Sequence, residues 1–219
     1  MSFWPLPKIL VERLHAGASR GPCVELGAGG GAFARRLRAL GLRPILLDRR
    51  PMPSTTGARV QADLRRLPLR SRAVGLLILA NTLRQVTPSE WPAAADEAAC
   101  AARSRGCLVV LEDEPEARDE AEGCYRSALR LLDRAEPGRG RPLPAAVVER
   151  ALVESWGAPV LSLVAENTER VLDPLAPLRW MRARRGIAES ELEELEENVR
   201  RFGMSYGRFW VRAFEQGKR

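Results

Sequence analysis

This 219-residue chain has no apolar run near the roughly 18 residues that a membrane-spanning helix needs. Residues 1–5 lack a basic region followed by an apolar one, so no secretory signal is expected. The four cysteines show no Cys-x-x-Cys spacing, and buried, reduced thiols are the simplest interpretation of them. Together these absences favour a cytoplasmic protein that does not depend on disulfides.

Lysine is nearly absent, since Lys8 and Lys218 are the only two among 35 basic residues. Such an arginine-rich composition, with abundant alanine, glycine and proline, is typical of a GC-rich bacterial genome. The net charge of +7 is therefore weak evidence for nucleic-acid binding. Residues 1–80 carry 14 basic and 4 acidic side chains, whereas residues 81–175 carry 11 and 17. A basic N-terminal half can attract an anionic partner, although solvated arginines explain the same pattern.

Short apolar segments alternate with helical patterns along the chain, which predicts an α/β fold with a mostly parallel sheet covered on both faces. The last strand is expected to run antiparallel at an edge of the sheet. The predicted strands are Cys23–Leu26, Pro44–Leu47, Arg59–Ala62, Ala73–Ala80, Cys107–Leu111, Val160–Ala165 and Arg208–Phe214. The predicted helices are Lys8–Ala16, Ala32–Leu40, Trp91–Arg103, Glu116–Arg134, Ala145–Trp156 and most of Leu178–Phe202.

The most informative segment runs from Cys23 to Gly31, where a short apolar strand ends in a glycine-rich turn before a helical pattern. Glycines allow a sharp turn and let a ligand approach the main chain, and the following helix offers unpaired N–H groups. Glu25, two residues before the first glycine, can accept hydrogen bonds from a ligand. Asp48 and Asp63 follow the second and third predicted strands.

These residues resemble the class I S-adenosylmethionine-dependent methyltransferases, and the resemblance covers nearly the whole chain. The segment from Glu25 to Gly31 is similar to the first motif of that family, acid-x-Gly-x-Gly-x-Gly. In the family, the acid at the position of Asp48 holds the ribose hydroxyls, and the acid at Asp63 contacts the adenine amino group. The resemblance implies S-adenosylmethionine as cofactor, with a binding site formed by Glu25, Gly27, Ala28, Gly29, Gly31, Asp48, Arg49, Asp63, Leu64 and Asn81.

The resemblance also implies a domain plan. We expect a Rossmann-like three-layer sandwich over residues 1–219, with a seven-stranded, mostly parallel sheet and an antiparallel last strand. Residues 1–20 are expected to form an N-terminal helical lid, and residues 175–203 a helical insertion before the last strand. The segment 67–83 resembles the small-molecule type found in quinone biosynthesis, in which the residue at Asn81 lies beside the methionine moiety of the cofactor.

Methyl transfer in this family is a direct SN2 displacement that leaves S-adenosylhomocysteine, so a base is needed only for a protonated nucleophile. His15, the only histidine, and Glu112 and Asp113, after the fifth predicted strand, are candidates for that base. An exposed helix histidine and a solvated acidic turn are the simpler interpretations of these residues.

The segment Asn81–Arg84 contains neither the Asn/Asp-Pro-Pro-Tyr/Phe nor the Pro-Cys motif, which argues against methylation of nucleic-acid bases. It also lacks the paired acids of metal-dependent relatives, so no metal is expected. A small-molecule acceptor is favoured, with a monomer and a homodimer both open. The alternatives are an RNA-directed methyltransferase or RNA-binding relative and a catalytically inactive relative. A dinucleotide-binding protein also fits the spacing Gly27-x-Gly29-x-x-Ala32.

Overall fold

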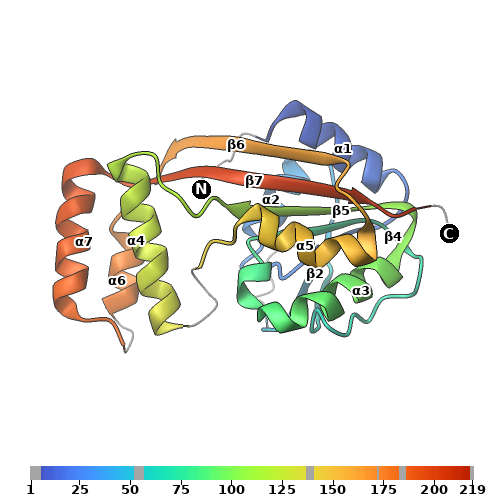
Figure 1. Cartoon of the computed structure of the whole chain (residues 1–219), viewed down its shortest axis with the longest axis horizontal. Coiled ribbons are helices and arrows are strands. Elements are labelled where there is room, and N and C mark those ends of the chain that lie inside the picture. The colour runs from blue at the N-terminus through green and yellow to red at the C-terminus, as the bar shows by residue number, and fades with distance from the viewer. Residues whose placement is uncertain (1–5, 52–56, 137–140, 172, 183–185, 218–219) are drawn as a thin grey trace.

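A computed structural model of the chain describes residues 6–51, 57–136, 141–171, 173–182 and 186–217. A seven-stranded sheet runs through it in the order β3-β2-β1-β4-β5-β7-β6 (Figure 1). Neighbours among the first five strands pair in parallel, whereas β7 pairs antiparallel with both β5 and β6. The strands are β1 (Cys23–Leu26), β2 (Ile45–Asp48), β3 (Arg59–Gln61), β4 (Val74–Ala80), β5 (Ala102–Asp113), β6 (Leu161–Arg170) and β7 (Ser205–Glu215).

The mixed sheet with an antiparallel last strand confirms the predicted fold class, but the predicted edge position of that strand is wrong. β7 lies between β5 and β6 because it is apolar on both faces. Trp210 and Phe214 are buried in the core on one face of the sheet, while Phe209 and Val211 are buried on the other. β6 suits the edge better, since its Val164 is 52 % exposed.

Helices cover both faces of the sheet. On one face, α3 (Trp91–Ala101) and α5 (Ala145–Trp156) pack through Trp91, Ala95, Val148 and Leu152. The predicted helix to Arg103 is too long, since the chain leaves α3 at Ala101 and enters β5 directly.

The opposite face is covered by α1 (Lys8–Ala18) and α2 (Ala32–Ala39). Leu10 and Leu14 of α1 are fully buried against it. The helix approaches β4 and β5 so closely that a Cβ on Gly17 would lie 3.1 Å from Leu76 and 3.2 Å from Cys107. α1 is therefore part of the sheet's cover. Residues 1–5 of the expected lid lie outside the described residues.

Three further helices stand together beyond one end of the sheet: α4 (Glu120–Ala135), α6 (Ala176–Arg182) and α7 (Glu189–Phe202) (Figure 1). They have an apolar cluster of their own, which includes Cys124, Leu178 and Leu195. α4 follows the carboxyl end of β5. This three-helix group therefore lies beyond the carboxyl ends of the parallel strands, where such sheets bind their ligands. No helix in the described ranges is long and apolar enough to span a membrane.

Candidate functional site

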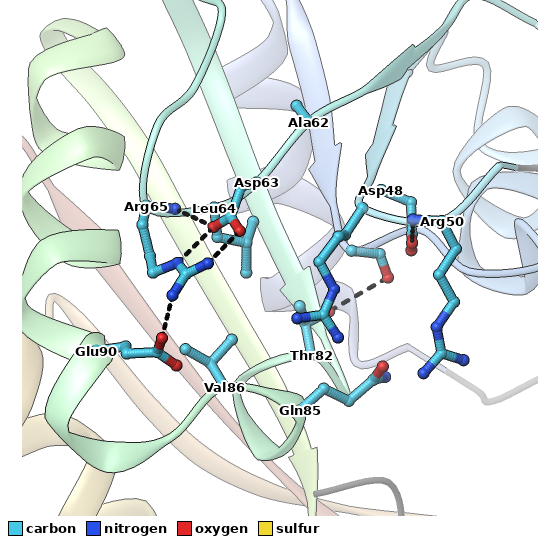
Figure 2. Close-up of a pocket in the computed structure, with 12 residues that line it drawn as sticks. Asp48, Arg50, Ala62, Asp63, Leu64, Arg65, Thr82, Gln85, Val86 and Glu90 are labelled. Carbon is cyan, nitrogen blue, oxygen red and sulfur yellow. Dashed lines mark hydrogen bonds and ion pairs between the residues drawn. The ribbon is translucent and has the colours of Figure 1, made fainter.

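A cleft opens at the carboxyl ends of β1, β2 and β4. The space within it is about 530 Å³, a volume that includes space open to solvent. Figure 2 shows Asp48 and Asp63 on one side of it, and Thr82, Gln85 and Val86 on the other. The lining residues are Gly27, Asp48, Arg49, Arg50, Ala62, Asp63, Leu64, Arg65, Thr82, Gln85, Val86 and Glu90.

Of the glycine-rich turn after β1, Gly27 lines this cleft, whereas Ala28, Gly29 and Gly31 are not among the lining residues. The main-chain oxygen of Leu47 accepts hydrogen bonds from the N–H groups of Gly27 and Ala28, at 2.7 and 3.0 Å. Gly27 has a φ of 69°, and a Cβ added there would lie 2.2 Å from Cγ2 of Thr82. Gly31 caps α2 in a left-handed conformation without a side-chain hydrogen bond to the first turn. The start of α2 therefore keeps main-chain donors that a ligand can use.

Asp48 lies where the resemblance expects it, at the end of β2 and in the cleft wall. Its Oδ2 accepts a hydrogen bond from the N–H of Gly29 at 2.7 Å, and its Oδ1 accepts one from the N–H of Arg50 at 2.8 Å. Each oxygen keeps a second lone pair. Neighbouring Arg49 lines the same wall and is exposed.

Asp63 also reaches the cleft, together with Leu64, which packs against the main core. The side chain of Arg65 binds Asp63 through Nε at 2.8 Å and Nη2 at 2.5 Å, and also contacts Glu90. The hydrogen bonds from Arg65 lower the pKa of Asp63 to about 2. Asp63 is thus an anion at neutral pH, although both of its oxygens already have a partner.

Glu25 does not line the cleft, which corrects the expectation of direct ligand contact. Val24 and Leu26 pack into the core under α3 and α5, so strand alternation turns Glu25 to the opposite face, behind the glycine turn. It is 2 % exposed, and its Oε2 has no hydrogen-bond partner within the part of the chain that the structure describes. Burial raises its pKa to about 8, although Arg38 and Arg35 lower it.

Asn81 joins the ends of two strands at the rim of the site and is not among the lining residues. Its φ of 53° is one that asparagine tolerates better than most residues. Its N–H donates to the main-chain oxygen of Leu111 at 2.8 Å, and its Oδ1 accepts from the N–H of Asp113 at 3.2 Å. Thr82, the next residue, does line the cleft, and its Oγ1 donates to the main-chain oxygen of Leu26 at 3.0 Å.

The floor of the cleft was not predicted from the sequence. It is formed by two short 3-10 helices, Leu83–Gln85 and Pro88–Glu90. Gln85, Val86 and Glu90 come from this stretch. A capping box at Thr87 and Glu90, Thr-Pro-Ser-Glu, was the signal available in the sequence. It marks a turn, but its orientation toward the glycine loop depends on tertiary packing.

The two acids proposed as bases are the last two residues of β5, and they are buried and bound to one arginine. Oε2 of Glu112 lies 3.1 Å from Nε of Arg84, and Oδ2 of Asp113 lies 2.8 Å from Nη2 of Arg84. Oε1 of Glu112 accepts from the N–H of Leu83 at 3.0 Å. Burial raises the pKa of Glu112 to about 7. Neither acid lines the cleft, and both form an ion pair with Arg84, so their role in proton transfer stays a prediction.

His15 lies in the last turn of α1 and is exposed. Gly17, two residues later, packs on Leu76 and Cys107 near the start of the parallel strands, so His15 lies toward the amino ends of the sheet. The structure does not bring it to the cleft, and its candidacy as a base is corrected. The described residues contain no group of three or more histidine, cysteine, aspartate or glutamate side chains able to hold a metal ion.

No protein-family model matches the sequence, and no curated protein shows significant similarity to it. Solved structures do match the fold. One is an S-adenosylmethionine-dependent methyltransferase from Methanosarcina mazei. Its TM-score is 0.58 at 13 % identity, over 97 % of this chain and 99 % of that one.

A second similar structure is the 1,6-didemethyltoxoflavin-N1-methyltransferase of Burkholderia thailandensis, with its substrate and S-adenosylhomocysteine bound. Its TM-score is 0.56 at 13 % identity, over 96 % of this chain and 78 % of that one. A third is the geranyl diphosphate C-methyltransferase of Streptomyces coelicolor, with a TM-score of 0.53 at 13 % identity, over 95 % of this chain and 80 % of that one. The classical dinucleotide-binding fold, by contrast, orders its strands 3-2-1-4-5-6 without an inserted antiparallel strand. This chain therefore has the fold of the class I S-adenosylmethionine-dependent methyltransferases.

Proposed function

We propose that this protein transfers a methyl group from S-adenosylmethionine to a small-molecule acceptor. The observation that carries the proposal is that Gly27 of the glycine turn and the carboxylates of Asp48 and Asp63 line one cleft. A plain strand–helix turn explains the glycines, but it leaves two carboxylates on one wall of an open cleft without a reason.

The cleft fits the cofactor. The missing Cβ at Gly27 lets Thr82 pack directly against the turn, and both residues line the cleft where an adenosyl group would lie. Asp48 would accept hydrogen bonds from the ribose hydroxyls through its free lone pairs. Asp63 would accept one from the adenine amino group, and Leu64 would supply apolar surface beside the ring. The N–H groups of Ala28, Gly29 and Gly31 already donate to Leu47, Asp48 and Ala28. We therefore assign to these three residues close packing of the main chain against the rest of the cofactor.

When bound, S-adenosylmethionine supplies a methyl group already activated on a sulfonium. The task of the protein is then to orient the acceptor and exclude water. The proposal assigns no general base, because Glu112 and Asp113 are bound to Arg84 and His15 lies elsewhere. An acceptor whose reacting atom has a free electron pair at neutral pH, such as an amine of low pKa or a stabilised carbanion, fits this site best.

A small-molecule acceptor is supported by the position of α4, α6 and α7. They stand beside the carboxyl ends of the strands, where they restrict access by a large polymer (Figure 1). Two of the similar structures are of enzymes named for small acceptors, 1,6-didemethyltoxoflavin and geranyl diphosphate. The narrower quinone-biosynthesis type rests on residues 67–83 alone and stays a prediction.

Calorimetric titration of S-adenosylmethionine and S-adenosylhomocysteine tests the proposal. Wild type should bind both with micromolar or tighter affinity, and Asp48→Asn should weaken both at least tenfold. The matched control is Asp96→Asn, an exposed aspartate on α3 that hydrogen-bonds Ser155. It should leave the affinities unchanged.

NAD should be titrated in parallel. Binding of NAD in place of S-adenosylmethionine would contradict the proposal, as would equal affinities for the Asp48 and Asp96 variants. Binding of S-adenosylmethionine together with tight, salt-dependent RNA binding would redirect the acceptor search to RNA.

A further inference from the structure

Arg126, in the middle of α4, is a buried cation to which the described residues offer no carboxylate. It is 2 % exposed. Its Nη2 donates to the main-chain oxygen of Arg208 at 3.1 Å, and its guanidinium carbon lies 5.2 Å from the ring centre of Tyr125. Its Nε and Nη1 are buried and make no hydrogen bond to any residue in the described ranges. Two nitrogens of a guanidinium with a full positive charge are thus left without a hydrogen-bond acceptor in these ranges.

The acids closest to Arg126 along these elements are bound to other arginines. Glu122, one turn earlier on α4, accepts from Nε and Nη2 of Arg118 at 3.0 and 2.7 Å. Asp113, which Oη of Tyr125 contacts at 3.3 Å, is bound to Arg84 at 2.8 Å. Neither acid is therefore left to neutralise Arg126.

Arg208 of β7 also carries an unsatisfied group, and its main chain contacts Arg126. Its Nε is buried and has no hydrogen-bond partner among the described residues. Its main-chain oxygen accepts from Arg126 and also from the N–H of Glu114, so the two arginines meet where β5 passes into α4. The rings of Tyr125 and Tyr206 lie beside them in an edge-to-face contact, with centroids 5.2 Å apart.

This region adjoins the proposed methyl-transfer site. Thr82 and Gln85 line the cleft, and Arg84 lies between them in the chain. Arg84 binds Asp113, and Asp113 contacts Tyr125, the neighbour of Arg126 on α4. The contacts through Arg84, Asp113 and Tyr125 thus connect the floor of the cleft with the buried guanidinium. This region lies beyond the carboxyl ends of the strands, where an acceptor would lie.

Burying a cation with unmet donors is unfavourable, and a planar fork of N–H groups matches a carboxylate in shape and charge. We propose that Arg126 binds the carboxylate of the methyl acceptor, so that the acceptor of this protein is a carboxylic acid. This assignment rests on the proposed methyltransferase function and adds the chemical class of the substrate to it.

Fluorine NMR with 4-fluorobenzoate and its neutral amide, 4-fluorobenzamide, tests the assignment. Both probes are titrated into wild type, with and without saturating S-adenosylhomocysteine. The benzoate should bind saturably and at least tenfold more tightly than the amide. Arg126→Met should abolish this preference, and Arg126→Lys, which keeps the charge but loses the fork, should retain part of it.

The matched control is Arg130→Met, one turn later on α4, where an exposed guanidinium donates to Oγ of Ser127 at 2.8 Å. It should bind the benzoate as wild type does. Because Arg126 is unsatisfied without a ligand, Arg126→Met should not lower the melting temperature of the ligand-free protein. A marked fall would show that Arg126 has a structural role and would overturn the proposal.

Two other results would overturn it: equal binding of the benzoate and the amide by wild type, and unchanged benzoate binding by Arg126→Met. At least tenfold tighter binding of phenyl phosphate than of benzoate would replace the carboxylate with a phosphate. Failure of the proposed methyltransferase function can be distinguished from failure of the acceptor assignment, since in the first case wild type would not bind S-adenosylhomocysteine. The acceptor assignment would fall with it, whatever the benzoate result.

Discussion

The carboxylate of Asp48 accepts a hydrogen bond from the N–H of Gly29 at 2.7 Å, which ties the end of β2 to the turn that follows β1. The preceding residue, Leu47, holds the same turn through its main-chain oxygen, at 2.7 Å from the nitrogen of Gly27. The shape of the glycine turn thus depends on its neighbouring strand as well as on its own glycines. A ligand hydroxyl at Asp48 would contact a group whose orientation is already determined.

Replacing Gly27 with alanine should damage both stability and cofactor binding. The left-handed conformation costs about 1 to 3 kcal/mol for a residue with a side chain, and the new Cβ would meet Cγ2 of Thr82 at 2.2 Å. Urea denaturation and calorimetry should show a lower free energy of unfolding and at least tenfold weaker S-adenosylmethionine binding.

Gly30→Ala is the control for this change, because a Cβ at Gly30 has no neighbour within 4 Å. Thr82→Ser in the Gly27→Ala background removes Cγ2 and should recover part of the loss. Equal behaviour of the two alanine variants would show that the turn tolerates a side chain at Gly27.

The adenine assignment of Asp63 predicts a specific loss of discrimination. Wild type should bind S-adenosylhomocysteine about tenfold more tightly than its inosine analogue, which lacks the amino group, since one hydrogen bond to a charged acceptor contributes about this much. Asp63→Asn should reduce that ratio toward one. Calorimetry with both ligands measures it, and an unchanged ratio would place the adenine elsewhere.

The buried ion pair of Arg84 should be important for stability. Arg84→Met would leave Glu112 and Asp113 buried without their cation, which costs about 3 to 5 kcal/mol for pairs of this kind. Arg65→Met removes an arginine from an exposed ion pair with Asp63 and should have a much smaller effect. Urea denaturation compares the two, and similar losses would contradict the importance of burial.

The buried carboxyl of Glu25 should make stability depend on pH. Burial raises its pKa from 4.5 to about 8, so the folded protein holds a proton that the unfolded chain releases between these values. The free energy of unfolding therefore falls as pH rises through this range. Glu25→Gln should flatten the fall and stabilise the protein at pH of about 9 by up to a few kcal/mol.

Urea denaturation of wild type and Glu25→Gln at pH values of about 5 and about 9 measures this difference. The difference between the two proteins isolates Glu25 from Glu112, whose pKa is also raised by burial. Parallel pH dependences would show that Glu25 titrates normally in the folded protein.

The sequence predicted those parts of the site that depend on local backbone requirements. A glycine at Gly27 marks a turn that other residues cannot adopt, and Asp48 is recognised because it follows an apolar strand. These signals need only a few consecutive residues. Strand–helix alternation likewise predicted the parallel sheet, because its period is readable along the chain.

What a buried or exposed group contacts was decided only by the tertiary structure. Nothing near Glu112 in the sequence indicates that Arg84, 28 positions earlier, neutralises it. Nor does the sequence around β7 indicate that this strand lies between β5 and β6 in the sheet. His15 and Arg126 have ordinary helical contexts, yet one is exposed away from the cleft and the other is buried without an anion. Such contacts join residues far apart in the chain, and their energies depend on burial, which exists only once the sheet and the three-helix group have packed.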